Sequence, residues 1–144
     1  MVLADPDERP HFYVVIYDGH CRICTQSVWQ LAMFDRSGSL AYLSLHDPRV
    51  AQRYPKLSYD QLMEQMWVVD PQGNQYGGVA AIRFLSCKLW LLWPLAMLLH
   101  LPLTGWFWTS CYRMVARFRY KLGGKTGCEN GECSVHVGRR APKE

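Results

Sequence analysis

The stretch Phe12-Tyr-Val-Val-Ile-Tyr-Asp-Gly-His-Cys-Arg-Ile-Cys24 decides the fold that this sequence predicts. Its first six residues are apolar and β-prone, which is typical of a strand covered on both faces. A glycine turn follows, and two cysteines with C-x-x-C spacing then open a segment with helical periodicity. A thiol in the first turn of a helix lies at the positive end of the helix dipole, where a thiolate is stabilised. The stretch therefore predicts a strand–helix unit that carries a reactive dithiol.

Downstream of this unit, the apolar periodicity alternates between that of strands and that of helices. We expect helices over 21–34, 47–54, 59–65 and 79–90, and further strands over 40–46, 66–69 and 74–76. Asp47 and Pro48 fit the N-cap and first position of a helix, and Asp70-Pro-Gln-Gly73 fits a type I turn. The order β-α-β-α-β-β-α predicts one small α/β sheet.

The composition is that of a globular protein with a single core. The chain has 144 residues, of which 49% are hydrophobic and 19% charged. We expect a flexible lead-in over residues 1–10, one domain over 11–122 that includes a helical extension over 89–122, and a Cys-containing basic tail over 123–144. The net charge of +4 is concentrated at the C-terminal end, since residues 111–144 hold eight Lys/Arg against three Asp/Glu. An anionic partner is therefore expected to meet that end.

The N-terminal residues are polar and acidic and contain no apolar signal-peptide core, so we expect a cytoplasmic protein. Structural disulfides are rare in that compartment. Six cysteines in such a chain indicate redox chemistry, metal binding or simple burial. For Cys87 and Cys111, which lie in apolar stretches, we expect buried structural thiols.

The segment Leu89–Trp108 is uncharged over twenty residues, which is long enough to span a membrane. Two prolines and a glycine within it disfavour a straight span. We expect two short helices packed on the sheet, broken near Leu101-Pro102, with association with a membrane surface through 89–108 as the alternative. The basic run 113–125 follows, with cations at Arg113, Arg117, Arg119, Lys121 and Lys125. We expect a solvated helix face there, with membrane contact again as the alternative. No nucleic-acid partner is expected, because nothing in the chain resembles a nucleic-acid-binding fold.

The two cysteines of the C-x-x-C unit are expected to have different roles. Cys21 lies at the helix N-terminus and should be the outward-facing nucleophile, whereas Cys24 lies one turn further in and should be the buried resolving thiol. The flanking His20 and Arg22 would lower the pKa of the Cys21 thiol. Asp18 has two compatible roles, as a turn residue and as a carboxylate that relays a proton for Cys24.

A zinc site is the competing interpretation, because C-x-x-C is also a zinc-ligand spacing. The buried strand and the following helix favour redox chemistry, so we expect neither a metal nor an organic cofactor at this dithiol. A membrane-peripheral adaptor without redox turnover is the other alternative. A second group consists of Cys128 and Cys133, followed by His136. Three interpretations stay open for it: exposed thiols without a fixed role, a reversible disulfide, or part of a metal site.

Three motifs resemble the DCC family of predicted thiol-disulfide oxidoreductases, which is named for an Asp and two Cys. Asp18, Cys21 and Cys24 match the first motif, and residues 70–73 with 78–81 resemble a later Asp-x-x-Gly and Gly-x-x-Ala pattern. The run Tyr112–Tyr120 is similar to the family's C-terminal Tyr and Ala-x-x-Arg-Tyr segment. The resemblance implies a thioredoxin-like fold and a redox activity on a protein or low-molecular-weight thiol or disulfide. The direction of electron flow stays open.

Thioredoxin-like enzymes usually carry a cis-proline opposite the dithiol, where it helps to pair with the substrate backbone. The corresponding segment Gln61–Met66 contains no proline. We expect Gln65 or Met66 to face Cys21, and the usual route of substrate binding is not supported by this segment.

Overall fold

The computed structural model describes residues 3–8, 12–89, 93–94, 97, 100–101 and 105–123. Within them, four strands form one mixed sheet in the order β2-β1-β3-β4. The strands are β1 (Tyr13–Tyr17), β2 (Leu40–Ser44), β3 (Trp67–Val69) and β4 (Gln75–Gly77). β1 pairs in parallel with β2 and antiparallel with β3, and β4 is antiparallel to β3. The helices are α1 (Arg22–Phe34), α2 (Pro48–Arg53), α3 (Tyr59–Glu64), α4 (Val79–Lys88) and α6 (Gly105–Gly123). This fold is thioredoxin-like, and the predicted order of elements is confirmed.

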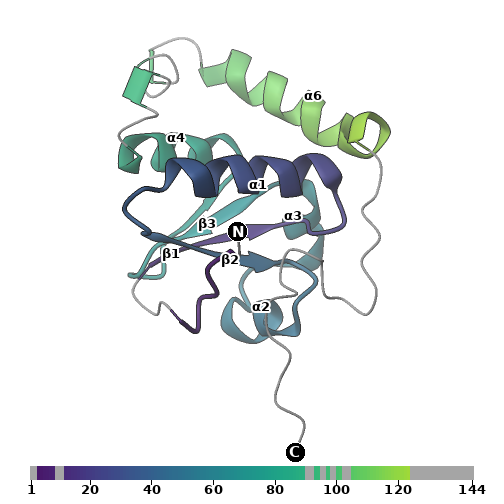
Figure 1. Cartoon of the computed structure of the whole chain (residues 1–144). Coiled ribbons are helices and arrows are strands. Elements are labelled where there is room, and N and C mark those ends of the chain that lie inside the picture. The colour runs from purple at the N-terminus through teal and green to yellow at the C-terminus, as the bar shows by residue number, and fades with distance from the viewer. Residues whose placement is uncertain are drawn as a thin grey trace, which may run out of the picture.

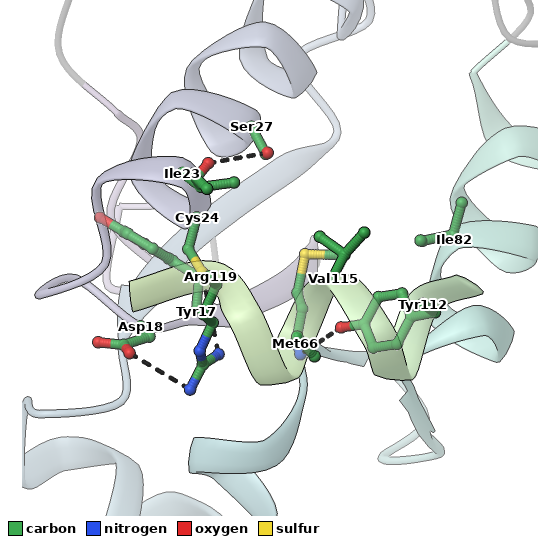
Figure 2. A pocket seen from close by; sticks show the side chains of 11 residues that line it. Tyr17, Asp18, Ile23, Cys24, Ser27, Met66, Ile82, Tyr112, Val115 and Arg119 are labelled. Atoms are coloured by element: carbon green, nitrogen blue, oxygen red, sulfur yellow. Dashed lines mark hydrogen bonds and ion pairs between the residues drawn. The ribbon is translucent and has the colours of Figure 1, made fainter. Parts of the chain in front are cut away.

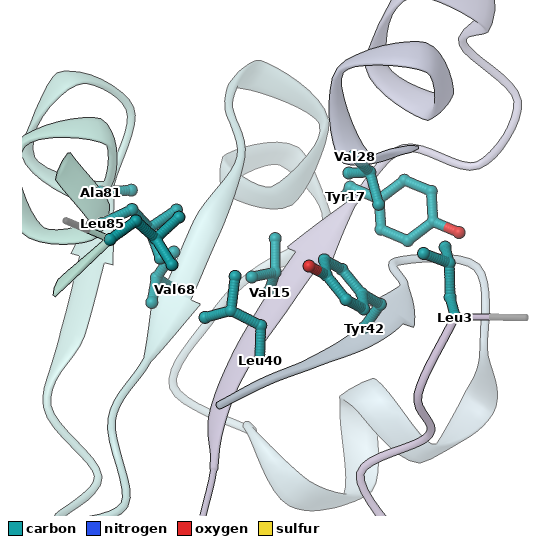
Figure 3. Packing of buried hydrophobic residues seen from close by; sticks show 10 residues of the cluster. Leu3, Val15, Tyr17, Val28, Leu40, Tyr42, Val68, Ala81 and Leu85 are labelled. Atoms are coloured by element: carbon teal, nitrogen blue, oxygen red, sulfur yellow. The ribbon is translucent and has the colours of Figure 1, made fainter. Parts of the chain in front are cut away.

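Both faces of the sheet are covered, which explains the unbroken apolar run in β1. Val15 and Tyr17 point to the face covered by α1 and α4, where Val28 and Leu85 join the same cluster (Figure 3). Val14 and Ile16 point to the opposite face and pack with residues of α2 and α3. Alternate side chains of a strand point to opposite faces, so a strand covered on both sides is apolar throughout.

Helix α6 adds a further layer to the thioredoxin-like core. It packs against α1 and α4 on their side away from the sheet (Figure 1). α6 is the second part of the expected helical extension, and most of residues 90–104 lie outside the described part of the chain. No helix in the described residues is long and apolar enough to cross a membrane.

Local signals in the sequence determine two of the turns that connect these elements. The Asp47 side chain accepts the N–H of Arg49 at 2.9 Å, and Pro48 follows it at the start of α2, as expected. Gly73 closes the turn after Asp70 with a φ of 88°, a region that glycine adopts without strain. β2 ends at Ser44, two residues earlier than the predicted end at residue 46, which places His46 in the loop before α2.

The N-terminal lead-in is a point where the structure differs from expectation. Residues 3–8 pack against the domain: Leu3 is only 3% exposed, and the Ala4 carbonyl accepts the N–H of Tyr42. Arg49 forms ion pairs with Asp5 and Asp7. The polar composition of this segment concealed an apolar anchor and long-range charge pairs.

The expectation of two buried thiols outside the dithiol is also wrong. Cys87 is exposed and Cys111 is half-buried. Cys87 is flanked by Ser86 and Lys88, and Cys111 follows Ser110, so the immediate neighbours of both thiols are more polar than the surrounding stretches.

Candidate active site

The dithiol lies at the junction between the end of β1 and the start of α1, as the sequence predicts. Cys21 is the N-cap of α1, and its sulfur accepts the Cys24 backbone N–H at 3.3 Å. The Cys24 thiol donates a second hydrogen bond to the Cys21 sulfur, with the two Sγ atoms 2.7 Å apart. The first turn of α1 contains no acidic residue that would oppose a negative charge. The Cys21 sulfur is therefore surrounded by donors at the positive end of a helix.

These contacts separate the acidities of the two thiols. The hydrogen bond from the Cys24 thiol is the main cause that lowers the pKa of Cys21 to about 6, with further help from the Cys24 N–H and the Arg119 charge. The same hydrogen bond, together with burial, raises the pKa of the Cys24 thiol. Because the two sulfurs share a proton, they titrate as a pair in which Cys21 holds the negative charge.

The expected exposure of the two thiols is reversed in the structure. Cys21, expected to face outward, is 0% exposed, whereas Cys24, expected to be the buried thiol, is half-buried and lines a cavity. α6 packs over α1 and places Arg119 beside the Cys24 sulfur, a contact that the periodicity of α1 does not predict.

Arg119 of α6 is the cation that reaches the site. It is only 6% exposed, and its Nη1 donates toward the Cys24 sulfur at 3.9 Å. Its Nη2 lies 3.5 Å from Asp18 Oδ2 and also donates to the Met63 carbonyl. The expectation that Arg119 belongs to a solvated basic face is therefore wrong, although Arg113, Arg117 and Lys121 are exposed as expected. Arg22, expected to tune the dithiol, is also exposed.

Asp18 is buried beside the dithiol, with no exposed side-chain surface. Its Oδ1 accepts the His20 backbone N–H at 2.9 Å and lies 3.0 Å from His46 Nε2, which donates to it in the Nε2–H tautomer. The rings of His20 and His46 stack with centroids 3.7 Å apart. Asp18 thus serves the turn, as expected, and also links Arg119 to the two histidines.

Asp18, His20 and His46 are also the residues with geometry for a metal ion. Their ligand atoms lie within 4.8 Å of one another, and among the described residues no other group of three or more His, Cys, Asp or Glu does so. The two dithiol cysteines are not part of this group. The hydrogen bond and ring stacking account for the cluster as a polar network. Cys128, Cys133 and His136 lie outside the described residues.

A cavity of about 160 Å³ opens beside Cys24, between α1, α6 and the start of β3 (Figure 2). Met66 lies in its wall, so it is the residue opposite the dithiol, while the Gln65 side chain packs near Gly77 and Gly78. The Met66 N–H donates to the Tyr112 hydroxyl at 3.0 Å. The described residues contain no cis peptide bond. Tyr112 thus occupies a backbone donor that a substrate strand would otherwise need.

Sequence reasoning missed three side chains of this site: His46, Tyr112 and Arg119. The sequence does contain a pattern that indicates Tyr112 and Arg119. Together with Ala116 they recur at helical spacing on one face of α6, and all three line the cavity. An arginine on the inner face of an amphipathic helix indicates a buried partner. Nothing in the sequence identifies that partner as a group 95 residues away.

The fold and this site define a thioredoxin-like protein with a C-x-x-C dithiol at a helix N-terminus. The family model described as DCC1-like thiol-disulfide oxidoreductase matches residues 15–125, and the chain belongs to this family. Neither the curated proteins nor the solved structures contain a match. The match includes α6, so Tyr112 and Arg119 fall within the family's extent.

Proposed function

We propose that this protein catalyses thiol–disulfide exchange, with Cys21 as the nucleophile and Cys24 as the resolving thiol. The observation that carries this proposal is the pair of donors on the Cys21 sulfur, the Cys24 thiol at 2.7 Å and the Cys24 N–H at 3.3 Å. Together they favour a thiolate on Cys21, and the thiolate is the form that attacks disulfides. A protein or low-molecular-weight disulfide is the proposed substrate.

In the proposed reaction, the Cys21 thiolate attacks one sulfur of the substrate disulfide and the other leaves as a thiolate. Cys24 then loses its proton and attacks the Cys21 sulfur, which releases the second substrate thiol and leaves a Cys21–Cys24 disulfide. Asp18 lines the same cavity as Cys24, and we assign it as the acceptor of that proton. Because Cys21 is buried, its attack requires a local opening of the groups that cover it.

Incubating the reduced full-length chain with two peptides joined by a disulfide tests this proposal. Trypsin cleaves after Arg22, so the two cysteines fall on separate fragments that a Cys21–Cys24 disulfide joins. We expect this linked pair by mass spectrometry and two free peptide thiols per substrate consumed. The zinc alternative predicts instead one tightly held zinc per chain and no linked fragments until a chelator is added. That result would overturn the proposal.

We also propose that the outer face of α6 contacts an anionic membrane surface. Large apolar side chains are exposed along this helix: Trp106, Phe107, Met114 and Phe118. Three exposed cations lie on the same helix: Arg113, Arg117 and Lys121. Exposed aromatic side chains beside cations are typical of helices that lie in a lipid interface. Trp93, Met97 and Leu101, in the preceding segment, are exposed as well.

Sedimentation with lipid vesicles tests this contact. The chain is expected to bind vesicles that contain phosphatidylserine, to bind less well in high salt, and to lose binding when Trp106 and Phe107 are both replaced by serine. Met33→Ser, which removes a 59% exposed methionine on α1, is the matched control and should bind as the unmodified chain does. Equal sedimentation of both variants with the unmodified chain would contradict the proposed contact.

A further inference from the structure

The cavity beside Cys24 has the properties of a binding site for a small apolar group. Most of its wall is apolar, from residues of α1, α4, α6 and the start of β3: Ile23, Met66, Ile82, Val115 and Ala116. Its volume is about 160 Å³, and a protein cavity of roughly 150 Å³ accommodates benzene. One reactive atom, the Cys24 sulfur, lies in the wall.

The polar groups that line this cavity are paired with one another, so they do not favour a peptide or a ligand with a high net charge. Asp18 and Arg119 both line it and lie 3.5 Å apart as an ion pair, so their charges compensate each other. The Met66 N–H is bonded to Tyr112, and the Met66 carbonyl accepts the N–H of Gly78 at 2.9 Å. A peptide could not accept a hydrogen bond from the Met66 N–H without breaking its bond to Tyr112.

We propose that this cavity binds a small apolar thiol, with an aryl or short alkyl body, that reduces the Cys21–Cys24 disulfide by attacking Cys24. The inference rests on the proposed function, because it supplies the second half of the exchange cycle. It assigns the two half-reactions to different sulfurs: the disulfide substrate reacts at Cys21, and the reducing thiol reacts at Cys24.

The step balances as an ordinary pair of exchanges. The thiolate RS⁻ attacks the Cys24 sulfur, the Cys21–Cys24 bond breaks, and Cys21 leaves as a thiolate. A second RS⁻ then attacks the R-side sulfur of the Cys24–S–S–R mixed disulfide. RSSR is released, and Cys24 leaves as a thiolate that takes up a proton. Over the full cycle, one substrate disulfide and two RSH become two substrate thiols and one RSSR.

The geometry of the site favours attack at Cys24 by a ligand in the cavity. Cys24 lines the cavity and Cys21 does not, so an entering sulfur meets Cys24 first. The Arg119 Nη1, 3.9 Å from the Cys24 sulfur, is a hydrogen-bond donor for the sulfur of an incoming thiolate. The Cys24 backbone N–H and the N-terminus of α1 stabilise a thiolate on Cys21 and make it a good leaving group, since a stabilised thiolate leaves faster.

The oxidised full-length chain can be reduced with benzyl mercaptan and, in parallel, with 2-mercaptoethanol and glutathione. After an acid quench, loss of the disulfide-linked tryptic fragments gives the rate. We expect benzyl mercaptan to react at least about tenfold faster than either polar thiol at equal thiolate concentration, because burying its ring is favourable. Its rate should also saturate with concentration. The trapped mixed disulfide should lie on the fragment that begins at Ile23.

Variants that fill the cavity separate binding from intrinsic reactivity. Ala116→Leu on α6 and Ser27→Leu on α1 each place a larger apolar side chain in the cavity wall. Both should remove most of the preference for benzyl mercaptan over 2-mercaptoethanol. Gln30→Leu introduces a leucine at an exposed position of α1 outside the cavity, so this variant should keep the preference for benzyl mercaptan.

Equal rates for the three thiols, or a mixed disulfide on the Cys21 fragment, would overturn the inference. So would an unchanged preference in both filled variants. These failures differ from a failure of the proposed function, which would appear earlier as the absence of a Cys21–Cys24 disulfide after reaction with the peptide disulfide.

Discussion

Cys21→Ser is expected to abolish thiol–disulfide exchange, and Cys24→Ser is expected to stop it after the first step. Removing the attacking atom of a covalent catalyst costs on the order of 10³-fold or more in rate. In Cys24→Ser the serine hydroxyl can still donate to the Cys21 sulfur, so Cys21 should still attack. Without a resolving thiol, the substrate stays bonded to Cys21 as a mixed disulfide. Mass spectrometry of the chain after reaction with a disulfide-linked peptide checks both outcomes.

The design of this experiment has to exclude the other thiols. Both variants are best made in a chain with Cys128→Ser and Cys133→Ser, so that the tail cysteines cannot resolve the trapped species. Cys87→Ser, at an exposed thiol, is the matched control and should react as the unmodified chain does. A substrate trapped equally well in Cys21→Ser would contradict the assigned roles.

Arg119→Met is expected to cause the second large effect, on stability and on the thiolate together. It leaves the Asp18 carboxylate buried without one of its ion-pair partners, and breaking a buried pair in this way costs about 3 kcal/mol of unfolding free energy. It also removes positive charge beside the dithiol, which should raise the pKa of Cys21 above its value of about 6. Urea denaturation and the thiolate absorbance at 240 nm measure the two effects separately.

Two further variants show whether the effect belongs to Arg119 or to the basic helix as a whole. Arg117→Met removes an exposed cation from the same helix and should change neither quantity measurably. Adding Asp18→Asn to Arg119→Met should recover part of the lost stability, because the unbalanced charge is gone. If Arg117→Met and Arg119→Met behave alike, Arg119 has no specific role at the dithiol.

Local patterns in the sequence were sufficient to predict the core of this fold. The apolar run that became β1 and the C-x-x-C unit after it gave the strand–helix unit and the position of the thiols. Asp47 with Pro48 gave the start of α2. Each of these signals acts within a few residues, so no tertiary information was needed.

The parts that were missed depend on contacts between distant segments. The contact between Arg119 and the Cys24 sulfur could not be predicted from α1, because the packing of α6 over that helix is a tertiary contact. Arg119 looked like one cation of a solvated run, and only its partners Asp18 and Met63 show otherwise. Leu3 belongs to the core, although the acidic stretch that follows it predicts a solvated lead-in. His46 lies beside Asp18 although 28 residues separate them in the sequence, a contact that no local pattern indicates.

The lowered pKa of Cys21 also predicts how the stability of the reduced protein depends on pH. The folded state holds the thiolate down to about pH 6, whereas the unfolded chain binds a proton below its ordinary thiol pKa. The thiolate therefore adds stability that is fully present above the unfolded pKa and is lost as the pH falls toward 6. Relative to Cys21→Ser, the reduced chain should gain stability from pH 6 to pH 9, and denaturation at several pH values checks this.

The proposed chemistry depends on a Cys21 thiolate at neutral pH, and thiolate absorbance at 240 nm measures it directly. The reduced chain is titrated from pH 4 to 10, and the titration of Cys21→Ser is subtracted. We expect a difference of one thiolate per chain with a midpoint near pH 6. A difference that appears only near pH 8.5, where an ordinary cysteine ionises, would contradict the account.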